Sequence, residues 1–462
     1  MKKILLCLFL VFTATVGVFA VQPITLRQAL GYALRHNGNV ESAREEYRSS
    51  AYDSKATIGT FLPRIDISGG YVKLNDPITM DLNNIRSAII EASGAAYFGA
   101  GGTNPAFTQS LGASMPSFEK TMLDENLTRV FITVVQPIFT GFKISANSKV
   151  KGLQKDASRL AYQNTRNKMI SSVIEDYYRV KLVEQSIQIK KNYKEDIDQH
   201  LDNAKKMYNS GLVSKVQVLK AMTAAANAES DYKSSLSDKE TAVSILGADL
   251  GADASNLELT DPLTMLSGFQ DLDYYLLRAQ DNNDLALLNI KKAGLEQKHK
   301  VSVGNTFPTI SAMGQYQLLQ DDLSDLEPEW FIGITASLNI FAGGQDYYKI
   351  QSSKAQLNSI DGQIDGAKRM LNAAVAKYFY ECQSAQDRYE ALKVSIAYAK
   401  ESVRLARAAF RARTGTSLEV IDAQMVLEKA QIDQAKAIFD FNSAFANLLH
   451  LCNLSEVSFR QQ

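Results

Sequence analysis

Two long stretches without proline constrain the fold of this 462-residue chain more than any other feature. The chain has nine prolines, yet none of them falls within residues 138–261 or 329–462. Proline removes a backbone donor and clashes with the preceding turn, so it is excluded from helix interiors. These stretches are therefore where long helices can run, and we expect a chain that is mainly helical.

Both stretches carry apolar residues at alternating spacings of three and four, the heptad pattern of coiled coils. The second stretch has Leu392, Ile396, Ala399, Val403, Ala406 and Phe410, then, after a break, Val420, Ala423, Leu427, Ala430, Gln434, Ala437 and Phe441. The first stretch has Ile197, Leu201, Ala204 and Tyr208, then Val218, Ala221, Ala225, Ala228 and Tyr232. The breaks predict two helical hairpins, at about 144–250 with a tip near Gly211 and at about 346–452 with a tip near Gly415. An ascending arm of about 65 residues would be about 100 Å long, which suits a rod that crosses a compartment.

The two halves of the chain repeat each other at fixed offsets. Asn37 and Pro63 recur as Asn282 and Pro308, whereas Gly141 recurs as Gly343 with a shorter offset. We therefore expect a first repeat at 21–262, a second repeat at 263–462, and an insertion at 75–127 in the first repeat alone. The insertion is rich in Ala and Gly, and its segment Ser87–Ala96 is a candidate helix. Three roles stay open for the insertion: a plain surface loop, a partial lid, or a partner-binding surface.

Each repeat also offers two strands, because apolar residues alternate there with polar or small ones. These strands are expected at about 64–74 and 129–139 in the first repeat and at about 309–319 and 330–341 in the second. Four strands cannot close a barrel around a channel, which takes at least about eight. The chain must then borrow strands from copies of itself. Three copies would give a 12-strand β-barrel that continues into the helical hairpins.

The N-terminus has the pattern of a secretory signal peptide at residues 1–20. Two lysines precede an apolar run, and Val18 and Ala20 are the small residues before the expected cleavage point. A retained membrane anchor is the alternative, although the run is shorter than the roughly 20 residues that span a bilayer. Acidic and basic residues balance at 50 each, which gives no basic excess for a nucleic-acid partner.

Several segments, in the same order, resemble the TolC-type outer membrane efflux protein family over nearly all of the mature chain. They are Phe61–Pro63 before the first strand, Gln136–Gly141 at a strand-to-helix junction, and the two hairpin tips, Tyr208–Val213 and Thr416–Gln424. The resemblance implies a homotrimer with a β-barrel in the outer membrane of a Gram-negative bacterium and a long α-barrel in the periplasm. It also implies contact with outer membrane lipid, a periplasmic adaptor (membrane fusion) protein and an inner-membrane transporter, so that the chain serves as the exit duct of a tripartite efflux or type I secretion system.

The resemblance places the channel aperture at the hairpin tips, formed by residues Gly211, Leu212, Val213, Arg413 and Gly415. Acidic residues of the second tip line the aperture in this family, and the matching positions are Glu419 and Asp422. A ring of carboxylates at a constriction favours cations. The alternative is that both residues belong to an ordinary solvated helix face.

The tips depart from the family pattern at three positions. A tyrosine, an arginine and an aspartate link neighbouring hairpins there, and the matching residues are Phe410, Gly415 and Gln217. None of the three can make that link, so packing or other polar contacts must hold the tips. Arg413 stands where a turn glycine is usual, which predicts either a different bend or a positive charge beside the carboxylates.

Enzymatic chemistry finds no support in the sequence. The four histidines are scattered, and no Cys/His cluster has metal-ligand spacing, so we expect no cofactor and no catalytic residues. The remaining alternative is a periplasmic coiled-coil adaptor or scaffold, which normally carries one long hairpin where this chain has two. Whether the transported substrate is a drug, a metal or a protein stays open.

Overall fold

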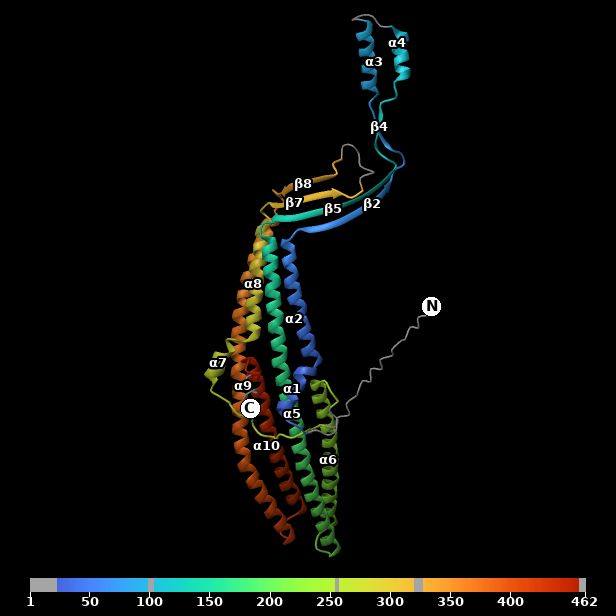
Figure 1. Ribbon diagram of the computed structural model, residues 1–462. Helices are drawn as coiled ribbons and strands as arrows, with labels where there is room; N and C mark the ends of the chain where they lie inside the picture. Colours follow the sequence, from blue (N-terminus) through green and yellow to red (C-terminus); the bar gives the residue numbers. More distant parts are fainter. Residues whose placement is uncertain (1–22, 99–103, 254–256, 320–326, 457–462) are drawn as a thin grey trace, which may run out of the picture. The chain divides into compact units, whose positions relative to one another are not determined.

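The computed structural model describes residues 23–98, 104–253, 257–319 and 327–456 (Figure 1). The signal peptide expected at 1–20 and residues 99–103 of the insertion lie outside the described residues. The chain divides into two compact units. One comprises residues 52–152 and 294–357, and the other comprises the segments up to 51, 153–293 and from 358 onward. Each unit thus takes segments from both halves of the sequence.

Four long helices form the two hairpins. The ascending arms α5 (Lys143–Asn209) and α9 (Gln345–Arg411) have 67 residues each. The returning arms are α6 (Lys215–Leu250) and α10 (Ser417–Leu451), which pack against each other. These bounds lie close to those expected from the heptads. No helix in the described ranges is long and apolar enough to cross a membrane.

The smaller unit holds an antiparallel sheet in the order β2 (Arg64–Lys73), β5 (Asn126–Phe139), β7 (Thr309–Gln317) and β8 (Trp330–Ser337). The central pair, β5 and β7, joins the two halves of the sequence. Ile67 pairs with Ile132, Ile132 with Tyr316, and Tyr316 with Trp330. Paired residues point to the same side of a sheet, so one face collects the isoleucines of β2 and β8 together with Ile132 and Tyr316. The opposite face is mixed, because Phe131, Val135, Met313 and Phe331 lie there among polar residues. The polar residues of this mixed face are Asp66, Ser68, Thr133, Ser311, Gln315 and Thr335.

Below the sheet, the junction between β5 and α5 lies against the end of α8 (Asn283–Gly304). Gly141 has φ +61°, and a Cβ built on Gly304 would stand only 2.2 Å from the carbonyl oxygen of Gly141. Real Cβ atoms never approach an oxygen that closely. Glycine at both positions therefore allows two backbones from different repeats to touch.

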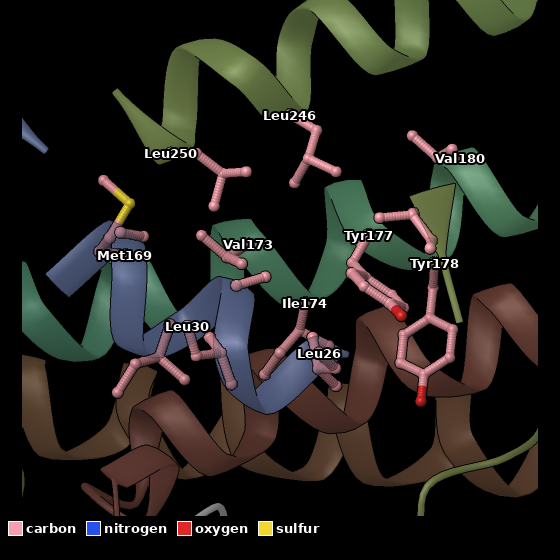
Figure 2. Packing of buried hydrophobic residues seen from close by; sticks show 14 of the residues in the cluster. Leu26, Leu30, Met169, Val173, Ile174, Tyr177, Tyr178, Val180, Leu246 and Leu250 are labelled. Carbon is pink, nitrogen blue, oxygen red and sulfur yellow. The ribbon is translucent and has the colours of Figure 1, made fainter. Parts of the chain in front are cut away.

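The larger unit has a core built around α1 (Leu26–His36), α5 and α6. Figure 2 shows Leu246 and Leu250 reaching from α6 toward Val173 and Ile174, with Leu26 and Leu30 of α1 on the other side. The hydroxyl of buried Tyr177, on α5, lies 3.2 Å from both the carbonyl oxygen of Ile24 and the carboxylate of Asp261. These bonds tie the paired segments β1 (Pro23–Ile24) and β6 (Glu258–Leu259) to the helices.

The second repeat has its own core between α7 (Leu272–Ala279), α9 and α10. The ring of Phe269 packs against Phe379, Phe441 and Phe445, with centroids 5.1 to 5.9 Å apart. Cys382 and Cys452 are buried free thiols in this core. They pack there as small hydrophobic residues.

The insertion at 75–127 is not a plain loop. A two-stranded ribbon, β3 (Ile78–Asp81) with β4 (Glu119–Leu123), carries two helices, α3 (Asn83–Phe98) and α4 (Pro105–Ser114) (Figure 1). The remaining elements are α2 (Gly38–Ala56) and the 3-10 helix η1 (Thr57–Phe61), which lead into β2. The Asn104 side chain accepts from the N–H of Ala106, and Pro105 occupies the first turn, so α4 begins with a regular cap.

Candidate channel aperture at the helical tips

The first tip is the turn between α5 and α6. Gly211 has φ +71°. Its N–H donates to the carbonyl oxygen of Tyr208, and the N–H of Leu212 donates to the carbonyl oxygen of Met207, both at 2.8 Å. This pair of bonds is a Schellman cap, which needs a left-handed residue after the helix and therefore favours glycine. The side chain of Leu212 stays exposed, whereas Val213 packs partly into the interior of the tip.

The second tip bends in the same way, without glycine at the left-handed position. Arg413 has φ +65°. Its backbone N–H donates to the Phe410 carbonyl oxygen, and the Thr414 N–H donates to the Ala409 carbonyl oxygen at 2.9 Å. The different bend considered for Arg413 is therefore wrong. Gly415 instead allows close packing, because a Cβ there would lie 3.0 Å from Ala409 Cβ.

A buried polar node joins the two hairpins beside the tips. We use this name for His200, Gln217 and Ser417, which come from α5, α6 and α10. His200 Nε2 lies 2.6 Å from Ser417 Oγ, and the Ser417 N–H donates to Gln217 Oε1 at 2.9 Å. Ser417 is fully buried and His200 is nearly so. The node thus connects the start of α10 to both arms of the first hairpin.

Apolar packing surrounds the polar node. Phe410, at the end of α9, is 3% exposed, and its ring centroid lies 4.8 Å from that of His200. The tip cluster comprises the buried residues Ala204, Val218, Ala221, Phe410 and Val420. Two of the positions that depart from the family pattern, Gln217 and Phe410, therefore do hold the tips together, within one chain and through a different set of contacts.

The two candidate aperture carboxylates are both exposed but have different surroundings. Glu419 completes a capping box, in which its Oε2 accepts from the Thr416 N–H at 3.1 Å and its own N–H donates to Thr416 Oγ1. Asp422 lines a groove of about 520 Å³ between α6 and α10, together with Tyr193, Leu219 and Met425. Both lie at the start of α10, just past the second tip.

Sequence reasoning missed His200, Ser417 and Gln424. His200 looked like one of several scattered histidines, and nothing in its spacing indicates a serine more than 200 residues away. Gln424 is 2% exposed, and neither atom of its side-chain amide has a hydrogen-bond partner within the described chain. An unsatisfied buried amide costs about 1 to 3 kcal/mol, so this seam between the hairpins is weaker than its apolar packing suggests.

Acid is expected to destabilise the tips through His200. Burial, and to a lesser extent the positive charge of nearby Arg407, together lower the pKa of His200 from 6.5 to about 4. Arg407 is ion-paired with Asp196 at 2.7 Å. The folded state therefore prefers neutral His200. Its stabilising contribution is present above about pH 6.5 and is lost as the pH falls toward 4, by about 2 to 3 kcal/mol at pH 4.5.

This expectation can be checked by urea unfolding at pH 7 and pH 4.5. The variant His200→Gln, whose amide can still bond to Ser417, should lose less stability on acidification than the unmodified protein does. A matched change at the exposed His36 should leave the acid sensitivity as it was. Equal acid sensitivity in the unmodified protein and the His200 variant would contradict the assignment.

Most of the sequence matches a known family. The model of the outer membrane efflux protein family matches residues 29–251 and 279–453, which include both hairpins and all four strands of the sheet. The chain belongs to the outer membrane efflux protein family.

Other outer membrane proteins are similar to this chain along most of its length. Outer membrane protein TolC of Escherichia coli (strain K12) is 22% identical over 346 residues, which is 69% of this chain and 68% of TolC. The crystal structure of the Campylobacter jejuni CmeC outer membrane channel matches with a TM-score of 0.74 at 14% identity, over 93% of this chain and 86% of that one. The Vibrio cholerae outer membrane protein VceC matches with a TM-score of 0.73 at 14% identity, over 92% and 95%. The structural matches establish a shared fold.

As an outer membrane efflux protein, this chain provides the outer membrane exit of an efflux system and has a large periplasmic part. Family membership sets aside the alternative of a periplasmic adaptor or scaffold. In the part of the chain that the structure describes, no group of three or more His, Cys, Asp or Glu side chains could hold a metal ion. The family is one of transport proteins. In this member, the polar node and the tip cluster lie at the tips.

Proposed function

We propose that three copies of this outer membrane efflux protein assemble into one continuous duct. In this assembly the sheets join into a 12-strand β-barrel in the outer membrane, and the hairpins form an α-barrel in the periplasm. The observation that carries the proposal is the four-stranded sheet. Its outer strands, β2 and β8, have open edges, and Ile65, Ile67, Ile332 and Ile334 on its apolar face are 67 to 79% exposed.

An exposed apolar face with two open edges is costly in water and prone to aggregation. Lipid would cover the apolar face, and strand pairing between copies would satisfy both edges. The mixed face would then line the lumen, which agrees with its serine, threonine and glutamine side chains. A single sheet of four strands is too narrow to enclose a lumen, so copies of the chain must supply the remaining strands.

The partners proposed for the periplasmic end are an adaptor protein and, through it, an inner-membrane transporter. The groove between α6 and α10 supports this proposal. It is lined by the apolar residues Val216, Leu219, Leu418 and Met425, each 43 to 57% exposed, with Lys220 and Asp422 among them. Exposed apolar grooves with a few charges are suited to an amphipathic helix. The helical hairpin of an adaptor has that form.

The proposed gate is the ring of tips around the axis of the trimer, where Glu419 and Asp422 of each copy would meet. The duct itself would be a passive conduit. The tips, held by the polar node and the tip cluster, would set whether it is open. The unsatisfied amide of Gln424 lowers the cost of separating the two hairpins at this seam.

Mass measurement in mild detergent tests the assembly. The purified protein is expected to have the mass of three chains and to conduct ions in planar bilayers. A charge on the apolar face should oppose insertion, since a lipid-facing arginine or lysine costs about 2 to 4 kcal/mol at the bilayer midplane and an aspartate somewhat less. Ile67→Asp should therefore be lost from the outer membrane, whereas Ser68→Asp, one position along the same strand but on the mixed face, should assemble. A folded monomer, or equal effects of the two substitutions, would rule out the proposed barrel.

A further inference from the structure

The insertion forms a defined helical hairpin. The Phe118 N–H donates to Asn83 Oδ1 at 3.0 Å, which closes the base of the hairpin where the ribbon ends. The Arg86 guanidinium, on α3, donates to the carbonyl oxygens of Gly112 and Met115 at the end of α4. Gly94 lies so close to α4 that a Cβ there would be 2.8 Å from Thr108 Cγ2. One side of α3 is thus fixed against α4.

The other side of α3 carries an apolar seam that nothing in the described chain covers. The seam comprises Ile85, Ile89, Ala92 and Ala96, at spacings of four, three and four. Ile85 is 54% exposed and Ile89 is 41% exposed. The sixteen residues of α3 and the ten of α4 include only two side chains that are charged at neutral pH, Arg86 and Glu91. Arg86 points to α4, so little charge would oppose a second copy at the seam.

The spacing of the seam indicates what covers it. Alternating steps of four and three are the heptad pattern by which one helix packs on another in a coiled coil. Isoleucine at both core positions, as at Ile85 and Ile89, favours trimers or tetramers over dimers. Lipid would not require this spacing, so the heptad steps favour another helix as the occupant.

The β3–β4 ribbon would hold the hairpins of three copies close together. The β3–β4 ribbon follows directly on β2 and β5. Between the two sheets, the Leu74 N–H donates to the backbone carbonyl oxygen of Glu125 at 2.7 Å. In the proposed trimer, β2 and β5 of each copy belong to one barrel, so the three hairpins are tethered at one rim. Short tethers give effective concentrations in the millimolar range. A helix of this length, marginal alone, can then associate.

We propose that the α3 helices of three copies form a parallel three-helix coiled coil through the Ile85–Ala96 seam, across the cell-surface mouth of the duct. This inference rests on the proposed trimer. The coiled coil narrows the cell-surface mouth, so the insertion gives the duct a second constriction in addition to the one at the tips.

Disulfide cross-linking of the full trimer tests the seam. In the variant Ile89→Cys, the new thiols of three copies should meet at the axis, and copper phenanthroline should convert up to about two-thirds of the chains to dimers, because three thiols form one pair. Ser87→Cys, on the same helix but facing away from the seam, is the matched control and should react at least tenfold more slowly. Native Cys382 and Cys452 are buried and should not interfere.

The outcomes separate this inference from the proposed function. An intact trimer by mass, with no faster cross-linking at position 89 than at position 87, overturns the coiled coil and leaves the duct in place. A folded monomer overturns both. If the coiled coil narrows the mouth, oxidised Ile89→Cys should also show lower single-channel conductance than the reduced protein, with recovery on addition of dithiothreitol. Unchanged conductance despite efficient cross-linking overturns the constriction.

Discussion

Gly304→Ala is expected to destabilise the protein by about 3 kcal/mol, because overpacking against a backbone that cannot move aside is one of the mechanisms behind large effects. The added Cβ would stand 2.2 Å from the carbonyl oxygen of Gly141 and 3.5 Å from the Lys143 side chain. Neither backbone can move easily, because Gly141 links β5 to α5 and Gly304 ends α8. The substitution should lower the urea midpoint of unfolding, followed by circular dichroism, and reduce the amount of protein in the outer membrane.

The same helix offers a control of opposite sign. Gly294 is also in α8, and a Cβ there would meet nothing within 4 Å. Gly294→Ala should stabilise the protein by about 0.5 to 1 kcal/mol, since alanine loses less backbone entropy on forming a helix. If both alanine variants shift the midpoint in the same direction, the close approach of the two repeats is not what requires glycine at position 304.

Removing the charges of Glu419 and Asp422 is expected to change ion selectivity more than any other substitution at the tips. Three copies would place their carboxylates around one axis, where a cation gains on the order of 1 kcal/mol from each nearby charge. In the double variant Glu419→Gln and Asp422→Asn, the cation-to-anion permeability ratio should fall about fivefold, and block by divalent cations should weaken. Glutamine at position 419 can still complete the capping box with Thr416, so the start of α10 should keep its conformation.

Single-channel recordings in asymmetric salt would measure both properties. The control is the pair Glu428→Gln and Asp433→Asn, further along α10, which removes the same number of charges away from the tips. It should alter selectivity much less. Unchanged selectivity and block in the tip variant would mean that Glu419 and Asp422 belong to a solvated helix face, and the aperture would then have to be formed by other residues.

The helical framework and the strand positions were predictable because each follows from a periodicity along the chain. Proline-free heptads give the hairpins, and alternation gives the four strands. The capping box of Thr416 and Glu419 was readable too, since it depends on residues three apart. Contacts such as that of His200 with Ser417 could not be predicted from the sequence, because they arise where four helices meet. Spacing along one helix carries no information about which polar side chains face each other across such a junction.

The insertion was predicted only in part. A helix was expected at Ser87–Ala96, which lies within α3, whereas α4 was not expected, because the many Ala and Gly residues resemble a loop in composition. Alanine is nevertheless the strongest helix former. The dipeptide Asn104-Pro105 is a helix-start signal that could have indicated α4. The low charge of the insertion also leaves the seam of α3 free to pack.

The pairing of β5 with β7 has a consequence for how the protein folds. These two strands are adjacent in the sheet, yet the whole first hairpin and the start of the second repeat separate them along the chain. The sheet cannot be completed until the second half has been exported, since β7 and β8 both lie there. Such non-local pairing slows folding, because a long loop must close before its contacts form. During that interval the apolar residues of β2 and β5 are exposed in the periplasm, where chaperones would be needed to prevent aggregation.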